Sequence, residues 1–264
     1  MIQQEFAKKA KEILQADQAV IGLAAGGSWI TAEMDEFSDL DLVLVTREKI
    51  AGNKELMLDY ANRLGTLLSA FTGEHVGEPR LLICLYDQPL LHVDIKFLTP
   101  EEFHSRVEDP VILLDRDGQL QEIINQTEAK FPYPDYQWIE DRFWAWIHYA
   151  LLKTGRGEYL EALDFFGFLR MTVLGPLLQI KHDKLPKGVR RAESQLHQHD
   201  LQTLLSTVPA YEKRSLINAL ENAVLLYREL RQSLFTTETV YNYEAEKKVM
   251  LFFEDIRHQL YRVK

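Results

Sequence analysis

The pattern of hydrophobic and polar positions divides the chain into a strand-rich part and a helix-rich part. Short apolar runs between turn residues predict strands at residues 20–25, 40–45, 80–86, 90–98 and 111–114, and helical periodicity covers residues 2–16, 54–71 and 119–130. Beyond the two prolines of residues 131–135, the periodicity is almost wholly helical. We therefore expect an α+β protein, with a sheet-containing N-terminal domain of residues 1–130 and a C-terminal helical bundle of residues 131–264.

The first two predicted strands flank a pattern that is typical of phosphate and metal binding. The first strand ends at Gly26, Gly27 and Ser28. Glycines allow a ligand to approach the backbone closely, and consecutive N–H groups with a hydroxyl can bind a phosphate. After ten more residues come Asp39 and Asp41, which the period of two places on one face of the next strand. Two neighbouring carboxylates repel each other unless a cation lies between them, and Mg²⁺ prefers such oxygen ligands.

A third aspartate lies in the return strand of a predicted hairpin at residues 80–98. Asp94 stands inside an otherwise apolar run, where a charge costs free energy unless it is paired or binds a metal. His92 and Lys96 share its face by the period of two, and Lys96 could neutralise a carboxylate, contact a phosphate or simply reach solvent. If this strand lies beside the one that carries the Asp-x-Asp pair, the three carboxylates converge.

These motifs together resemble a known superfamily. Gly27-Ser28, ten residues, Asp39-x-Asp41 and a lone aspartate in a later strand are similar to the signature of the polymerase-beta-like nucleotidyltransferases, and most similar to its small-molecule branch, the aminoglycoside nucleotidyltransferases. The likeness covers residues 20–98. It implies a mixed sheet with flanking helices and the transfer of a nucleoside monophosphate from a nucleoside triphosphate, with ATP as the expected donor, to a hydroxyl of a small molecule.

The resemblance also implies roles for individual residues. Asp39, Asp41 and Asp94 would bind two Mg²⁺ ions, and Asp94 would lie next to the acceptor hydroxyl and activate it. Three further residues would contact the triphosphate through the glycine turn, namely Gly26, Gly27 and Ser28. The helical domain would bind the acceptor.

The helical domain offers less specific candidates. Lys153 stands at the end of a predicted helix beside a glycine-rich turn, and we expect it to contact the triphosphate. Glu161 and Asp164 are alternative general bases, although charges in an apolar helix also form purely structural ion pairs. The aromatic residues of the helix at 136–154 are expected to be core.

Composition narrows the class of protein further. The formal net charge of −10 argues against broad binding of a nucleic-acid backbone, which needs many cationic residues. The single cysteine, Cys84, lies in an apolar strand and is expected to be a buried thiol. No run of consecutive apolar residues approaches 18, and the first residues lack the pattern of a signal peptide, so we expect a cytoplasmic location.

Three alternatives remain open at this point. The fold could be an inactive or regulatory nucleotide-binding module, it could belong to a toxin–antitoxin pair, or it could transfer a nucleotide to a protein hydroxyl. The retained trio of aspartates argues against loss of turnover, because buried like charges are costly without a cation. The sequence leaves the acceptor, the base of the nucleotide and the oligomeric state undetermined.

Overall fold

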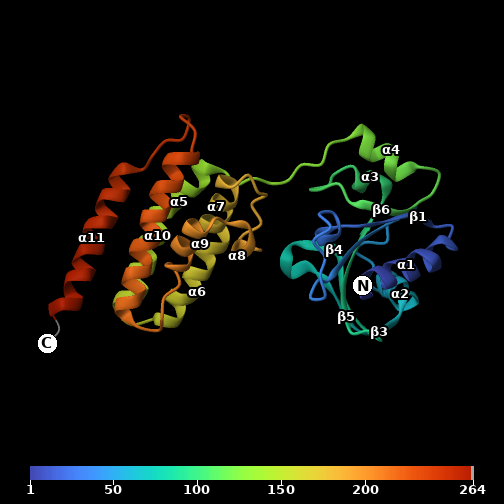
Figure 1. Ribbon diagram of the computed structural model, residues 1–264, viewed down its shortest axis with the longest axis horizontal. Coiled ribbons are helices and arrows are strands. Elements are labelled where there is room, and N and C mark those ends of the chain that lie inside the picture. The colour runs from blue at the N-terminus through green and yellow to red at the C-terminus, as the bar shows by residue number, and fades with distance from the viewer. Residues whose placement is uncertain (263–264) are drawn as a thin grey trace. The chain divides into compact units, whose positions relative to one another are not determined.

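The computed structural model describes the backbone of residues 1–262 and the side chains of residues 1–258 (Figure 1). The chain forms two compact units, residues 1–131 and the residues from Pro132 onward. The first unit contains a mixed sheet with helices, and the second is helical. The prediction of an α+β fold is therefore confirmed.

The first unit is built from six strands and short flanking helices within residues 1–131. Its elements in chain order are α1 (Ile2–Gln15), β1 (Val20–Ala25), η1 (Gly27–Trp29), β2 (Leu40–Thr46), α2 (Lys54–Leu64), β3 (Thr66–Gly73), η2 (Glu74–Val76), β4 (Glu78–Asp87), β5 (Leu91–Leu98), α3 (Pro100–Phe103), β6 (Val111–Asp115) and α4 (Gln119–Gln126).

The strands form one sheet in the order β3-β4-β5-β2-β1-β6. β2 and β5 run parallel, and the other neighbouring pairs are antiparallel. Helices α1 and α2 pack on one face, where a continuous core includes Phe6, Leu14 and Met57 with Leu42 and Cys84. Burial raises the pKa of the Cys84 thiol to about 12, so this cysteine is an inert core residue.

The helix predicted at residues 54–71 is wrong in its second half. Helix α2 ends at Leu64, and Gly65 is fully extended (φ 175°, ψ −170°), so the chain turns directly into the edge strand β3. Leu68 and Phe71, which the helical period placed in the core, are about half exposed. The reason is that apolar residues in this segment fit either period, and pairing with β4 decided between them. The helix predicted to end at residue 130 also stops early, at Gln126.

The second unit is a bundle of helices around an aromatic core. Its elements are α5 (Tyr136–Arg156), α6 (Tyr159–Leu169), the π-helical turn η3 (Arg170–Leu174), α7 (Gly175–Lys181), α8 (Ala192–Gln195), α9 (Gln198–Leu205), α10 (Lys213–Leu234) and α11 (Tyr243–Arg262). The Tyr227 ring stacks on Phe143 at 3.5 Å between centroids, and Trp144 packs edge-on to both. Fully buried Glu140 accepts hydrogen bonds from Trp144 and Tyr227 and pairs with Arg231 at 3.1 Å. Its carboxylate therefore has hydrogen-bond partners although it lies in the core.

One stretch of this bundle is unusually apolar. Among the described residues, the continuous helical stretch Tyr159–Lys181 is long and apolar enough to cross a membrane, with a mean hydropathy of 1.3 over its best window. Counting consecutive apolar residues in the sequence did not indicate this. Half of that window is buried inside the unit.

Candidate functional site

The turn after β1 is built around the side chain of Asp41. Gly26 donates its backbone N–H to the carbonyl of Asp41 at 2.9 Å, and Gly27 adopts a left-handed conformation (φ +56°). A Cβ atom at position 27 would lie only 1.9 Å from Oδ2 of Asp41. Position 27 therefore needs glycine twice, for its backbone conformation and for the space that the carboxylate occupies.

Asp41 and Asp94 are partners across neighbouring parallel strands. Residues 40–45 of β2 align with residues 93–98 of β5, and this register pairs Asp41 directly with Asp94. Paired residues project to the same face of a sheet, and neighbouring strands are roughly 4.8 Å apart. β2 and β5 are therefore adjacent strands, which is the arrangement on which the expected convergence of the carboxylates depends.

Asp94 lies in a partly buried and electrostatically strained position. Its side chain is 20% exposed, and burial raises the pKa of this carboxyl, with a further rise from the negative charge of Asp39. His92 opposes this rise, since its Nε2 lies 2.9 Å from Oδ1 of Asp94. Lys96 does not pair with Asp94 here; its Nζ lies 2.7 Å from Glu78, whose pKa is lowered to about 2 by hydrogen bonds from Arg80 and Lys96.

Asp39 is placed by the loop that precedes β2. The Asp35 carboxylate accepts hydrogen bonds from the Phe37 N–H and the Ser38 hydroxyl, which folds the end of this loop on itself. The side chain of Gln3, which is fully buried on α1, donates to the carbonyls of Asp35 at 3.1 Å and of Ser38 at 2.7 Å. Sequence reasoning missed Gln3, because a polar residue on an amphipathic helix carries no signal of a long-range contact.

The donor chemistry of the three aspartates fits Mg²⁺. All the donors are carboxylate oxygens, as a hard cation requires, and the glycine turn lies against one of them. Within the described residues, however, no three His, Cys, Asp or Glu side chains meet in a metal-binding cluster. Asp41 and Asp94 are paired on neighbouring strands and the charge of Asp39 acts on Asp94, so these three carboxylates are the residues that could hold the ion.

The candidates of the helical unit lie in a local ion-pair cluster. Lys153 Nζ is 2.8 Å from Glu158 and 2.9 Å from Glu161, and the pKa of Lys153 is raised by these two contacts. Glu161 also accepts a hydrogen bond from the Tyr149 hydroxyl. Asp164 is exposed, so its charge does not need the buried partner that the apolar helix suggested.

A partly exposed row of aromatic rings runs along α5 and α6. Successive centroids are 5.2–5.8 Å apart through the series Trp138, Trp146, Phe168, Phe165 and Tyr149. The first, third and last of these side chains are 39%, 41% and 38% exposed. The prediction that the aromatic residues of residues 136–154 are core is therefore correct for Phe143 and Trp144 but wrong for Trp138 and Tyr149, while Trp146 is partly buried against the core.

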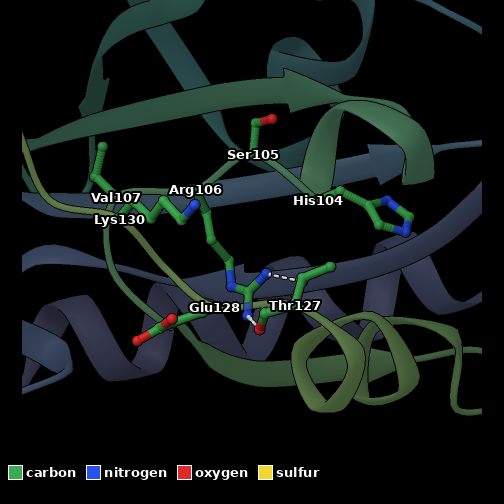
Figure 2. A pocket seen from close by; sticks show the side chains of 7 residues that line it. All are labelled: His104, Ser105, Arg106, Val107, Thr127, Glu128 and Lys130. Atoms are coloured by element: carbon green, nitrogen blue, oxygen red, sulfur yellow. Dashed lines mark hydrogen bonds between the residues drawn. The ribbon is translucent and has the colours of Figure 1, made fainter.

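A separate pocket lies between the ends of α3 and α4, with a cavity volume of about 570 Å³ (Figure 2). The guanidinium of Arg106 crosses it and donates to Asp109, to the Thr127 hydroxyl and to the carbonyls of Ile124 and Thr127. These carbonyls are at the C-terminal end of α4, so Arg106 acts as a cap for that helix. None of the three candidate aspartates lines this pocket.

Comparison with known proteins gives structural similarity only. No protein-family model and no curated protein matches the chain. An aminoglycoside 6-adenyltransferase from Bacillus subtilis is 15% identical, with a TM-score of 0.41 over 97% of this chain and 98% of that one. A nucleotidyltransferase-like protein from Exiguobacterium sibiricum is 12% identical, with a TM-score of 0.35 over 97% of this chain and 91% of that one.

A spectinomycin adenyltransferase from Enterococcus faecialis, solved with ATP and spectinomycin, is 16% identical, with a TM-score of 0.33 over 86% of this chain and 99% of that one. The assignment of an activity to this chain rests on its own residues, above all the turn at Gly27 and the aspartates beside it.

Proposed function

We propose that this protein is a magnesium-dependent nucleotidyltransferase, which transfers a nucleoside monophosphate from a nucleoside triphosphate, with ATP as the expected donor, to a hydroxyl of a small molecule. The observation that carries the proposal is the close contact between the Gly27 turn and the Asp41 carboxylate, with Asp94 on the neighbouring strand. In this arrangement the turn that would bind phosphate and the carboxylates that would bind the metal lie on neighbouring strands, which supports the proposal.

Each residue then has a defined task. Asp39 and Asp41 would hold the Mg²⁺ that accompanies the triphosphate, and bound Mg²⁺ would neutralise charge on the phosphates and on the leaving pyrophosphate. The N–H groups of Gly27 and Ser28 and the Ser28 hydroxyl would orient the phosphates. Gly26 would help to bind the phosphates through the fold of the turn. Lys153, from the helical unit, would contact the triphosphate.

Asp94 would accept the proton of the acceptor hydroxyl. The acceptor oxygen forms a bond to the α-phosphorus while the bond from the α-phosphorus to the bridging oxygen breaks, and pyrophosphate leaves with that electron pair. Burial and the charge of Asp39 raise the pKa of Asp94, which makes this carboxylate a better proton acceptor than an ordinary surface aspartate.

The helical unit would bind the acceptor. Its partly exposed aromatic row can pack against the apolar faces of a ring-containing molecule, and the carboxylates of Glu158 and Glu161 lie at the Tyr149 end of the row. Aromatic faces and carboxylates both attract ammonium groups. A cationic acceptor of the aminoglycoside type therefore suits this surface and the net charge of −10.

The test is a direct transfer assay. The protein is incubated with Mg²⁺, with each of labelled ATP, GTP, CTP and UTP, and with a panel of aminoglycosides, and the acceptors are then analysed by mass spectrometry. We expect one acceptor to gain the mass of a nucleoside monophosphate, with release of one pyrophosphate, and we expect the Asp41→Asn variant to show neither. Nucleotide binding without transfer to any acceptor, small molecule or protein, would instead indicate a regulatory module.

A further inference from the structure

His92 is the residue that contacts the candidate base. His92 and Asp94 stand two positions apart on β5 and so share one face of the sheet. The distance from Nε2 of His92 to Oδ1 of Asp94 is 2.9 Å, a normal hydrogen bond. When the Asp94 carboxylate is ionised it can only accept, so Nε2 is then the donor.

The neighbouring cation is already engaged elsewhere. Lys96 is the other charged residue on this face of β5, and its Nζ lies 2.7 Å from Oε2 of Glu78. Arg80 holds the same glutamate through two hydrogen bonds of 2.7 Å each. This cluster fixes Lys96 at the other end of the strand face, so the orientation of the Asp94 carboxylate depends on His92.

The exposure of the two side chains differs in a way that fits a positioning role. His92 is 49% exposed and Asp94 is 20% exposed. A half-exposed imidazole contributes little to the core, which lies on the opposite face of β5 with Val93 and Ile95. The contact with Asp94 therefore does not serve the packing of the sheet.

Orientation matters because an aspartate carboxylate rotates easily. Its terminal torsion has a broad, roughly two-fold profile, so either oxygen can turn toward a substrate unless a neighbour holds one of them. We propose that His92 is a positioning residue that holds Oδ1 of Asp94 and thereby presents Oδ2 to the acceptor hydroxyl. This inference rests on the proposed transfer reaction and deepens it. It predicts an effect on turnover that passes through Asp94 and does not involve nucleotide binding.

The experiment compares four proteins in the transfer assay: the parent, His92→Ala, His92→Gln and His104→Ala. Loss of an oriented partner typically reduces activity by roughly 10–100-fold, so we expect a fall in kcat of about that size in His92→Ala. The KM for the nucleotide and the melting temperature should stay unchanged. His92→Gln keeps an N–H donor of similar reach and should recover most of the turnover. His104 is a second exposed histidine of the same unit, and His104→Ala should behave like the parent.

Each other outcome has a definite meaning. An unchanged kcat in His92→Ala, with an active parent, would overturn this inference and leave the proposed function intact. The same holds if His92→Ala loses melting temperature and His92→Gln fails to restore turnover, because the role would then be structural. A parent protein that transfers nothing would overturn both. Adding His92→Ala to Asp94→Asn is the further check, since the histidine change should cost little more turnover once the Asp94 carboxylate is absent.

Discussion

The carboxylate of Asp41 fills the space where a side chain on Gly27 would lie: a Cβ atom at position 27 would be only 1.9 Å from Oδ2 of Asp41. Gly27 also has a positive φ of +56°, and the preceding N–H, that of Gly26, is bonded to the backbone carbonyl of Asp41. The turn and the carboxylate are thus one unit, in which Asp41 sets the position of the backbone that we propose to bind phosphate.

The first prediction separates the two constraints on Gly27. In Gly27→Ala and in the control Gly118→Ala, an alanine must adopt a positive φ, which costs about 1–2 kcal/mol in either protein. The added Cβ meets nothing within 4 Å at Gly118, whereas at Gly27 it displaces the carboxylate of Asp41. We therefore expect a loss of unfolding free energy in both variants in denaturant titrations, larger in Gly27→Ala, and loss of Mg²⁺–ATP binding in Gly27→Ala alone. Equal nucleotide affinity in the two variants would contradict the arrangement.

The second prediction concerns the aspartate pair. Asp39→Asn and Asp41→Asn should each abolish Mg²⁺-dependent nucleotide binding in isothermal titration, because each removes a carboxylate ligand. The fold should stay intact, because each change also removes one negative charge from a set of like charges. Asp117→Asn is a matched control, since Asp117 also belongs to an Asp-x-Asp sequence but lies in a turn at φ +59°, where asparagine is equally suited. Unchanged binding in the Asp39 and Asp41 variants would remove the metal assignment.

The outline of the fold follows from local signals in the sequence. Thr99, Pro100 and Glu102 predict the start of α3, and the structure shows the matching capping box, in which Thr99 accepts from the Glu102 N–H. The alternation of residues 90–98 predicts β5, which is the strand that carries Asp94. By contrast, residues 66–73 satisfy a helical and a strand-like period at once, and only the long-range pairing with β4 makes them a strand.

The candidate site is predictable where it depends on spacing and not where it depends on tertiary contacts. Asp39, Asp41 and the glycine turn follow from the order of motifs along the chain. The partner of Asp94 does not follow from the sequence, because His92 and Lys96 both share its face of the strand by period. His92 contacts Asp94 in the structure, whereas Lys96 pairs with Glu78 of β4.

The third prediction tests the long-range contact of Gln3. Gln3→Leu removes two hydrogen bonds from a buried donor to the carbonyls of Asp35 and Ser38, which should cost roughly 1–3 kcal/mol of stability. The loop before Asp39 should then exchange its amide hydrogens faster, and Mg²⁺–ATP should bind more weakly. Gln121→Leu, at an exposed site whose amide bonds only along its own helix to Asn125, is the control and should change neither.

The fourth prediction addresses Lys153. If it contacts the triphosphate, Lys153→Met should weaken nucleotide binding more at low than at high ionic strength, since salt screens partly exposed charges. Lys181→Met is the matched control, because Lys181 also bridges two carboxylates of the helical unit, Asp200 and Glu229. If both variants keep the parent's affinity at both salt concentrations, Lys153 serves only its ion pairs with Glu158 and Glu161.

The last prediction is that Asp94→Asn separates catalysis from stability. The pKa of Asp94 is raised in the folded protein, so its contribution to stability is present at low pH and is lost as the pH rises through that raised pKa. At pH 7 the ionised carboxylate therefore weakens folding, and asparagine, which can still accept from His92, should melt at the same temperature or higher. Lys96 loses no partner, because it pairs with Glu78.

Turnover of Asp94→Asn should nevertheless fall by orders of magnitude with nucleotide affinity retained, because Asp39 and Asp41 still hold the nucleotide's metal and proton transfer acts in the transition state. A thermal melt at pH 7, a titration with Mg²⁺–ATP and a single-turnover assay on this variant decide the matter together. A large drop in melting temperature with normal activity in the folded fraction would falsify the role of Asp94 as the base, because a buried carboxylate whose loss destabilises the fold is a structural partner.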